Sequence, residues 1–345
     1  MAAYTAIDDV GSFFNTVLYV GNDGTGHAIT GTGFQPNFTW IKNRDAADFH
    51  ILTDSVRGAT NYLQSNDSAK TATDAESLQS FDTDGFTVGN IAQINTSPED
   101  YVSWSWKMGT TSGLTGGTIT PDGYSFSATA GQGVYEYTGG GSAGTITHGL
   151  GAVPKFMMVK RSEHDAQEWR LYFGALGATK NMVLDQSDAA NTTSINWNDT
   201  APTNTVFTVG SSLTESAKEM MAYVFVDVQG YSKFGSYSGN GNVNGTFVYT
   251  GFRPGWIILK NADTTNGWNI YDVKRMTRNV SSIVLPPQTT GAGSVSANWA
   301  IDIYCNGFKI KSATNEANDN LAQILYGAFA DTPLVNSNGI PGTAR

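Results

Sequence analysis

The sequence predicts an all-β protein made of three tandem antiparallel β-sandwich domains of jelly-roll-like form. A proline-containing apolar run that closes with lysine recurs three times, as GFQPNFTWIKNRD from Gly33, GAVPKFMMVKRSE from Gly151 and GFRPGWIILKNAD from Gly251. The runs lie roughly 100 to 120 residues apart, which is the length of a domain rather than of a solenoid turn. Short apolar strands separated by Gly, Ser and Asn turns, with no convincing helical period, are typical of sandwiches.

The linkers between the domains are predicted from clusters of Gly, Ser and Thr. Such clusters occur near residues 110–122 and 228–235, and they mark loops rather than regular elements. We therefore expect domains at residues 1–115, 116–230 and 231–345.

The strands of each repeat can be followed in order. An aromatic strand that ends in a Gly turn comes first, and the signature strand with its proline follows, since proline is tolerated at a strand start. In repeat 1 the alternation of Phe34, Pro36, Phe38 and Trp40 with polar residues predicts a half-buried strand, whereas both parities are apolar around Trp256, which predicts burial on both faces.

Further strands complete each repeat. An aromatic-polar-aliphatic segment comes next, at 48–51, 168–171 and 267–270, and Asp-Gly or Asn-Gly turns predict hairpins in repeats 1 and 3. The segments 67–78 and 214–221 are the places where we expect a helical turn or two. Each repeat ends in an alternating strand: Val102, Trp104, Trp106; Met221, Tyr223, Phe225; Leu325, Gly327, Phe329.

The composition excludes several classes of function. The chain has 20 Lys and Arg against 30 Asp and Glu, a net charge of −10, so no nucleic-acid partner is expected, because phosphate binding needs a basic surface. The N-terminus lacks a signal-peptide pattern and no long apolar run occurs, so we expect neither secretion by that route nor membrane insertion. The single Cys305 excludes an intrachain disulfide and is expected to be buried and inert.

Three patterns resemble sites of chemistry but are better explained by structure. The segment 140–144 matches G-x-S-x-G, yet a nucleophile elbow needs a following helix and the sequence predicts a strand there. The Asp82-Thr83-Asp84-Gly85 segment lacks the remaining ligands of a calcium loop. The four histidines lack metal-ligand spacing, and His50, near three aspartates, is expected at a solvated strand edge, although a catalytic or metal role is conceivable. No catalytic residue, cofactor or metal site is therefore predicted.

The aromatic residues allow one ligand-binding hypothesis. The chain has 8 Trp and 15 Tyr, most of them at core positions of the repeats. Trp197 and Trp299 lie in Asn/Ser-rich or Ala/Ser-rich segments outside the signature strands. They are the candidate surface aromatics for a glycan ligand.

A resemblance to a known family covers nearly the whole chain. The segments that show the resemblance are AYTAIDD at the start, GFQPNFTWIKNRDAADFHILTDSVRGATNYLQSN, FDTDGFTVG with YVSWSWK, GYSKFGSYSGNG with FVYTGFRP, and the terminal VNSNGIPGTAR. They resemble a repeat family of virion and tail-associated structural proteins in marine tailed bacteriophages. The second repeat lacks the Trp-Ile-Lys-Asn-Arg sequence that is usual in this family. Because opening and closing phrases are both present, the chain is expected to be complete.

The resemblance implies a virion structural protein, assembled in the host cytoplasm and without enzymatic activity. A tail-fibre or tail-appendage component involved in host attachment is favoured, while a capsid decoration protein and an isolated carbohydrate-binding module remain alternatives. A polysaccharide-degrading enzyme would need a pair of facing carboxylates, and no such pair is indicated. Expected partners are other virion proteins, further copies of this chain as a homotrimer, and a host-surface glycan.

Overall fold

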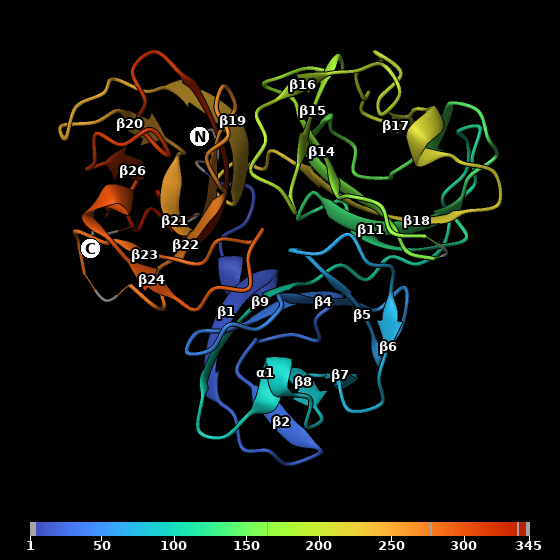
Figure 1. The fold of residues 1–345 in the computed structure, drawn as a ribbon, viewed down its shortest axis with the longest axis horizontal. Helices are drawn as coiled ribbons and strands as arrows, with labels where there is room; N and C mark the ends of the chain where they lie inside the picture. The colour runs from blue at the N-terminus through green and yellow to red at the C-terminus, as the bar shows by residue number, and fades with distance from the viewer. Residues whose placement is uncertain (1–4, 164, 277, 337, 343–345) are drawn as a thin grey trace.

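The computed structural model describes residues 5–163, 165–276, 278–336 and 338–342, and their regular structure is almost entirely antiparallel β. The all-β prediction is confirmed. The three repeats form three lobes around a common centre, with repeat 1 in blue and cyan, repeat 2 in green and repeat 3 in orange and red (Figure 1).

Repeat 1 contains nine strands and the one α-helix of the described residues. Its elements are η1 (Val10–Ser12), β1 (Phe14–Val20), β2 (His27–Thr30), β3 (Phe38–Asn43), β4 (Ile51–Asp54), β5 (Asn61–Gln64), β6 (Ala72–Thr73), β7 (Leu78–Asp82), β8 (Gly85–Val88), α1 (Ala92–Asn95) and β9 (Asp100–Trp106).

Among the described residues, repeat 2 has the same succession except that one additional strand, β10, comes first and β7 has no counterpart. Its elements are β10 (Gly123–Ser127), β11 (Gln132–Thr138), β12 (Gly144–Thr147), β13 (Pro154–Arg161), β14 (Arg170–Phe173), β15 (Lys180–Val183), β16 (Asn191–Thr192), β17 (Val206–Val209), η2 (Ser211–Leu213) and β18 (Glu219–Val226).

Repeat 3 completes the chain. Its elements are β19 (Ser232–Ser238), β20 (Phe247–Tyr249), β21 (Phe252–Asn261), β22 (Asn269–Asp272), β23 (Ile283–Val284), β24 (Ser294–Val295), η3 (Ala297–Trp299), β25 (Ile301–Tyr304), β26 (Gly307–Ile310) and β27 (Gln323–Pro333). The predicted boundaries at 115/116 and 230/231 fall in the connections before β10 and β19.

One sheet topology is repeated three times. The long sheets have the orders β1-β9-β3-β4-β5-β6, β10-β11-β18-β13-β14-β15-β16 and β19-β27-β21-β22, and the short sheets are β2-β8-β7, β12-β17 and β20-β26-β25. In every repeat the last long strand therefore lies between the first strand and the signature strand. This order requires contacts between the two ends of a repeat, which a local sequence pattern does not specify.

The signature strands occupy equivalent places in their sheets. In the registers, Phe38 faces Trp106, Phe156 faces Phe225 and Trp256 faces Phe329, and each of Phe38, Phe156 and Trp256 lies two residues after the proline. The glycines that open the three runs, Gly33, Gly151 and Gly251, all have positive φ, at 81°, 73° and 84°, a conformation that glycine adopts without steric cost. The repeat assignment is thus reproduced by the strand register.

The signature strand of repeat 1 is buried on both faces, so the half-buried prediction for it was wrong. All six residues of β3 are buried. One face, with Ile41, packs in the apolar cluster of repeat 1 beneath the short sheet, and the other face, with Trp40, packs in the cluster at the centre of the molecule. Polar residues such as Thr39, on the same face as Ile41, are hidden as well, because the short sheet of repeat 1 covers this face while the other repeats cover the face of Trp40.

Three aromatic residues at equivalent positions meet at the centre of the molecule. Ring centroids of Trp106 and Phe225 are 6.4 Å apart, those of Trp106 and Phe329 are 5.5 Å apart, and those of Phe225 and Phe329 are 5.6 Å apart. The surrounding apolar cluster includes residues of all three repeats. The repeats therefore share one central core in addition to the packing within each lobe.

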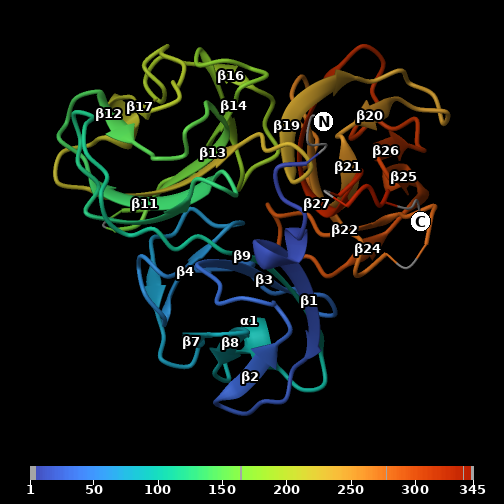
Figure 2. The same ribbon diagram turned by 180° about the vertical axis from the view of Figure 1, so that it is seen from behind.

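A set of backbone hydrogen bonds closes the repeats into a ring. The donors are the backbone N–H groups of the residues just before β6, β16 and β24, and each acceptor is the carbonyl group two residues after the signature lysine of the next repeat. The hydrogen bonds are Thr71 N to Ser162 O at 2.8 Å, Ala190 N to Ala262 O at 2.7 Å, and Gly293 N to Arg44 O at 2.9 Å. The contacts run from repeat 1 to 2, from 2 to 3 and from 3 to 1. The N-terminal segment adds a further contact, since Ala6 N donates to Gln229 O at 2.9 Å and thus lies beside β19 (Figure 2).

Two local predictions were wrong. Residues 67–78 form β6, the start of β7 and turns, and residues 214–221 form a turn and the start of β18, so neither segment is helical. Cys305 is partly exposed in the β25–β26 turn rather than buried in a strand. The strand ends one residue earlier than its apolar pattern suggested, because Cys305 and Asn306 form the two-residue turn that places Tyr304 opposite Gly307.

Candidate functional site

The three signature lysines, Lys42, Lys160 and Lys260, are buried and hold loops in place. Lys42 Nζ donates to Asn43 O at 2.7 Å and Ala46 O at 3.2 Å, and Lys260 Nζ makes the equivalent bonds to Asn261 O and Thr264 O. Lys160 Nζ donates to Ser68 O of repeat 1 at 2.6 Å and to Gln167 O. Burial lowers the pKa of each lysine to about 8. Their recurrence therefore has a structural reason and does not indicate a catalytic amine.

His50 is an interior residue, so the predicted solvated strand edge was wrong. Its Nδ1 accepts a hydrogen bond from Trp40 Nε1 at 2.9 Å, and its Nε2 donates to Pro286 O of repeat 3 at 3.2 Å. These bonds fit the neutral ring, and burial holds the pKa of His50 well below 6.5. The ring is fully buried, so it is not placed to act on a ligand from solution.

The strand registers show which residues are equivalent to His50. Aligning the segments 48–51, 168–171 and 267–270 end to end would have matched it with Arg170 and Asn269. Because Ile51 faces Ile41, Arg170 faces Val159 and Asn269 faces Leu259, the position of His50 is filled by tryptophan in the other repeats, at Trp169 and Trp268. Trp169 Nε1 donates to Gln64 O at 2.8 Å, and Trp268 Nε1 donates to Val183 O at 2.9 Å. All three rings thus donate to a neighbouring repeat, and this forms a second closed set of contacts.

Buried ion pairs stabilise two of the three junctions between repeats. Asp54 pairs with Arg57 at 2.6 Å and accepts from Tyr223 Oη of repeat 2 at 2.7 Å. Asp272 pairs with Arg275 at 2.5 Å and accepts from Trp104 Nε1 of repeat 1 at 3.1 Å. The third junction has the apolar Phe173 at the position equivalent to Asp54, where it stacks on Trp268. These carboxylates are committed to guanidinium and aromatic partners and are not facing catalytic pairs.

The aromatic candidates for ligand binding are not where the sequence placed them. Trp197 is fully buried and lies edge-on to Tyr172 in the core of repeat 2, so its prediction as a surface aromatic was wrong. Trp299 is half-buried against the central cluster. Both lie in polar stretches of sequence, but their indole rings fold inward because a tryptophan side chain gains free energy by burying its large apolar area.

The remaining motifs are turns or loops, and one prediction cannot be followed. Ser142 is exposed in the loop between β11 and β12, and Asp82 and Gly85 pair at the β7–β8 hairpin. Among the described residues, no group of three or more His, Cys, Asp or Glu side chains could hold a metal ion. His164 lies outside the described residues. No helix in the described part of the chain is long and apolar enough to cross a membrane.

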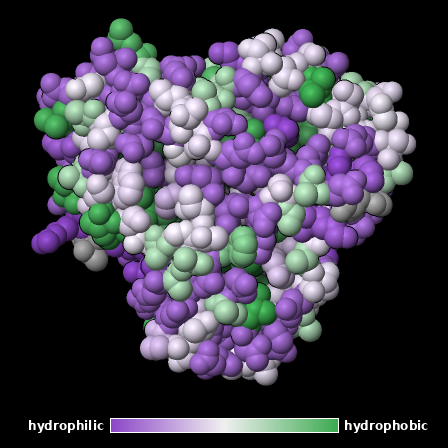
Figure 3. Space-filling model, in the orientation of Figure 1, coloured by the Kyte–Doolittle hydropathy of each residue, from purple (hydrophilic) through white to green (hydrophobic). Residues whose placement is uncertain are grey.

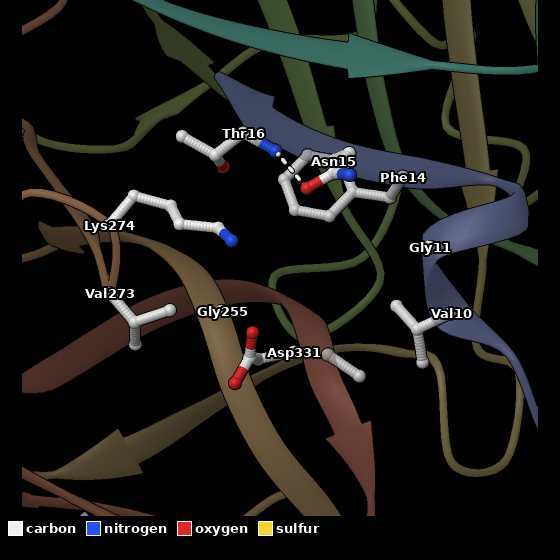
Figure 4. Close-up of a pocket in the computed structure, with 10 residues that line it drawn as sticks. Val10, Gly11, Phe14, Asn15, Thr16, Gly255, Val273, Lys274 and Asp331 are labelled. Atoms are coloured by element: carbon white, nitrogen blue, oxygen red, sulfur yellow. Dashed lines mark hydrogen bonds between the residues drawn. The ribbon is translucent and has the colours of Figure 1, made fainter. Parts of the chain in front are cut away.

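A small pocket lies between repeats 1 and 3. Figure 4 shows Phe14 and Asn15 of β1 opposite Lys274 and Asp331 of repeat 3. Its volume is about 50 Å³, enough for at most a few water molecules. Asp331 is paired with Arg253, so this pocket is a poor candidate for a ligand site.

A more polar pocket lies between repeats 1 and 2. It has a volume of about 140 Å³ and includes Arg57, Ser162, Glu136 and Glu219 among its lining residues. Burial, and next the charge of Glu219, raise the pKa of Glu136 to about 7. Arg57 is held by Asp54, and Ser162 stands at the position that is equivalent to Arg44 of repeat 1, where the arginine pairs with Asp100. The arginine that lines this pocket therefore already has a partner.

In the part of the chain that the structure describes, the most accessible aromatic residues lie on the short sheet of repeat 3. The Phe247 side chain is 43% exposed and that of Tyr249 is 53% exposed, while Val248 between them is buried. Tyr304 lies on the same outward face, and its ring contacts that of Phe247 edge-on at 5.7 Å. We call Phe247, Tyr249 and Tyr304 the aromatic face. In the view of Figure 3 most of the surface is hydrophilic and hydrophobic residues form small separate groups, so three neighbouring aromatics are a distinct feature.

A groove adjoins the aromatic face at Tyr249. Its volume is about 430 Å³, within the range of small-molecule sites, and it is lined by Asp227, Val228, Gln229, Gly230, Ser232, Lys233, Tyr249, Thr250, Gly251 and Leu334. Lys233 Nζ lies 5.4 Å from the centre of the Tyr249 ring and donates to Tyr249 O at 3.1 Å. Asp227 Oδ1 accepts from Phe234 N at 2.8 Å. The groove thus combines one aromatic wall with two charged groups that are held by hydrogen bonds and with the exposed amide of Gln229.

Comparison with known protein families gives one match, and it extends over all three repeats. Residues 9–333 match the family described as a domain of unknown function, DUF7483. The chain belongs to the DUF7483 family. The match begins just before β1 and ends with β27, so the DUF7483 domain corresponds to the closed body of three lobes and not to one repeat. Neither the search of curated proteins nor the search of solved structures found a match.

The sequence missed the aromatic face and the groove for one reason. Phe247 and Tyr249 stand in FVYTG, a phrase resembling the other aromatic strands that open or precede a repeat, and most aromatic residues of the repeats were assigned to core positions. A usable signal was present in the spacing: the aromatics are two residues apart on a short strand whose middle residue is apolar, so two of its three side chains must face away from the core.

Proposed function

We propose that this DUF7483 protein is a structural component of a bacteriophage virion, in a tail appendage that contacts the host surface. The observation that carries the proposal is a closed body of three lobes in which, among the described residues, an outward aromatic face is found on the third lobe alone. Exposed aromatic groups on an otherwise polar surface mark a contact with another molecule. The resemblance to virion and tail-associated proteins supports the same conclusion.

The three-lobed body suits a rigid spacer in a particle. Its junctions contain buried ion pairs, aromatic contacts and two closed sets of hydrogen bonds, so its lobes are held in a fixed arrangement. With the aromatic face of repeat 3 toward the host, the polar outer surfaces of repeats 1 and 2 are available to neighbouring virion proteins. Assembly of the particle in the host cytoplasm needs no export of the chain.

The capsid decoration alternative has one observation in its favour. Three lobes of equivalent topology around a common centre give a single chain approximate threefold symmetry, and symmetric assemblies offer threefold positions. The expected homotrimer stays a prediction. Light scattering of the purified protein would measure its oligomeric state.

The test is to locate the protein in purified particles. Mass spectrometry of nuclease-treated, gradient-purified virions should detect this chain, and antibody labelling in electron micrographs should place it on the tail. Labelling of the head instead would support decoration. Detection only in the lysate of infected cells, and not in intact particles, would overturn the virion proposal.

A further inference from the structure

The aromatic face is not required by the fold, as the two other repeats show. Ile29, Ile146 and Val248 are buried at the same register position, opposite Phe86, Phe207 and Phe308 respectively. By that register, the position of Phe247 is filled by Ala28 and Thr145, and the position of Tyr249 by Thr30 and Thr147. The short sheets of repeats 1 and 2 thus form with small or polar residues at the two outward positions that Phe247 and Tyr249 occupy in repeat 3. Phe247 and Tyr249 therefore call for an explanation other than packing.

The three rings are arranged side by side on one sheet face. Phe247 and Tyr249 are two residues apart on β20, so their side chains emerge on the same face about 7 Å apart. Gly307 lies opposite Tyr249 on one side and Tyr304 on the other. A Cβ atom at Gly307 would first meet the Val248 carbonyl oxygen, as one at the equivalent Gly85 would meet the Ile29 carbonyl oxygen, and it would lie 3.1 Å from Phe247 Cζ. The glycine is therefore required by the close backbone approach within the sheet, and its missing side chain also leaves space beside the Phe247 ring.

The groove supplies hydrogen-bonding groups beside the last ring. Asp227 and the amide of Gln229 are exposed, and the Lys233 ammonium is held beside Tyr249. Asp227 offers an acceptor, Lys233 a donor, and Gln229 both. A ligand that fits must therefore carry an apolar face for the ring and several groups that both donate and accept hydrogen bonds.

We propose that the groove and the aromatic face together bind a neutral glycan. The C–H face of one sugar ring stacks on Tyr249 while its hydroxyl groups bond to Asp227, Gln229 and Lys233, and the next sugar along the chain lies on Phe247. A hydroxylated ring meets both requirements at once, whereas a purely apolar partner would leave the charged groups of the groove unsatisfied. This inference rests on the host-contact role proposed above and names its ligand class.

The experiment uses the purified full-length chain on an array of immobilised neutral, amino and acidic oligosaccharides, followed by calorimetric titration with the best neutral oligosaccharide. The informative variants are Tyr249→Thr and Phe247→Thr, because threonine occupies these positions in repeat 2 with the fold intact. The matched control is Ile195→Thr on repeat 2, since Ile195 is 54% exposed and lies outside the groove. Circular dichroism confirms that each variant is folded.

We expect the wild-type protein and Ile195→Thr to bind a neutral oligosaccharide with the same affinity. Tyr249→Thr should lose at least about tenfold in affinity, and Phe247→Thr should lose less, chiefly for longer oligosaccharides. No retention of the wild-type protein by the array would overturn the proposal, and so would retention that Tyr249→Thr leaves unchanged. Self-association that disappears in Tyr249→Thr without glycan binding would assign the face to a second copy of the chain instead.

The outcomes separate this inference from the virion proposal. A protein found in particles that binds no glycan would refute only the ligand, and a protein that binds glycan but is missing from particles would refute only the virion role.

Discussion

Replacement of Trp106 by alanine tests whether the three repeats unfold as one body. Trp106 is 1% exposed and its ring centroid lies within 4.9 Å to 6.4 Å of those of five aromatic rings, namely Phe14, Phe38, Phe225, Trp256 and Phe329. Removing a buried tryptophan typically costs about 3–5 kcal/mol. The many aromatic contacts, each worth about 0.5–1.5 kcal/mol, place the expected loss near the upper end, at about 5 kcal/mol.

The shift in melting temperature depends on how many residues unfold together. With about 2.1 cal/mol/K of unfolding entropy per residue, a unit containing all three repeats should lose roughly 7 °C for this change. If repeat 1 unfolded by itself, the same free energy would lower its own transition by roughly 20 °C and leave the others in place. Because the three repeats share one core, we expect a single thermal transition, whose midpoint Trp106→Ala lowers by roughly 7 °C.

The assay is differential scanning calorimetry of the wild-type protein, Trp106→Ala and the control Trp106→Phe. Phenylalanine is the residue of repeats 2 and 3 at this position, so the control should cost at most about 1–2 kcal/mol. Several separate transitions in the wild-type protein, with only one of them lowered by Trp106→Ala, would refute the shared core.

Three further predictions concern the buried charges. The signature lysines have a pKa of about 8 in the folded protein against about 10.4 when unfolded, so the unfolded chain binds more protons between these values. The free energy of unfolding, measured by denaturant titration, should therefore rise as the pH increases from about 8 to 10, and a flat profile would contradict their burial as charged groups. His50, whose pKa is lowered in the folded protein, should make stability fall as the pH drops below about 6.5, and His50→Phe should reduce that slope. Arg57→Leu leaves the buried charge of Asp54 unpaired and should lower the free energy of unfolding by about 3–5 kcal/mol. The control Arg44→Leu removes an ion pair that is partly exposed to solvent and should lower it by less than about 1 kcal/mol. Equal losses in the two variants would contradict a stabilising role of the buried junction pair.

The sequence by itself determined the fold class and the internal repetition. The Pro-to-Lys runs, the Gly turns with positive φ and the closing alternation of Trp104 and Trp106 are local patterns, and each specifies a strand or a turn without reference to distant residues. For that reason the signature strands and the hairpins were predicted close to their observed positions.

Only the tertiary structure decided which faces were buried and which residues meet. Alternation in β3 indicated one buried face, that of Phe38 and Trp40, which the other repeats help to cover, but the short sheet of repeat 1 covers the second face as well. The ring positions of His50, Trp169 and Trp268 became equivalent only through strand register, since their residue types differ. Trp197 turned inward although the sequence suggested a surface position, because burial depends on what the remainder of the chain places over a side chain, and local spacing carries no information about that cover.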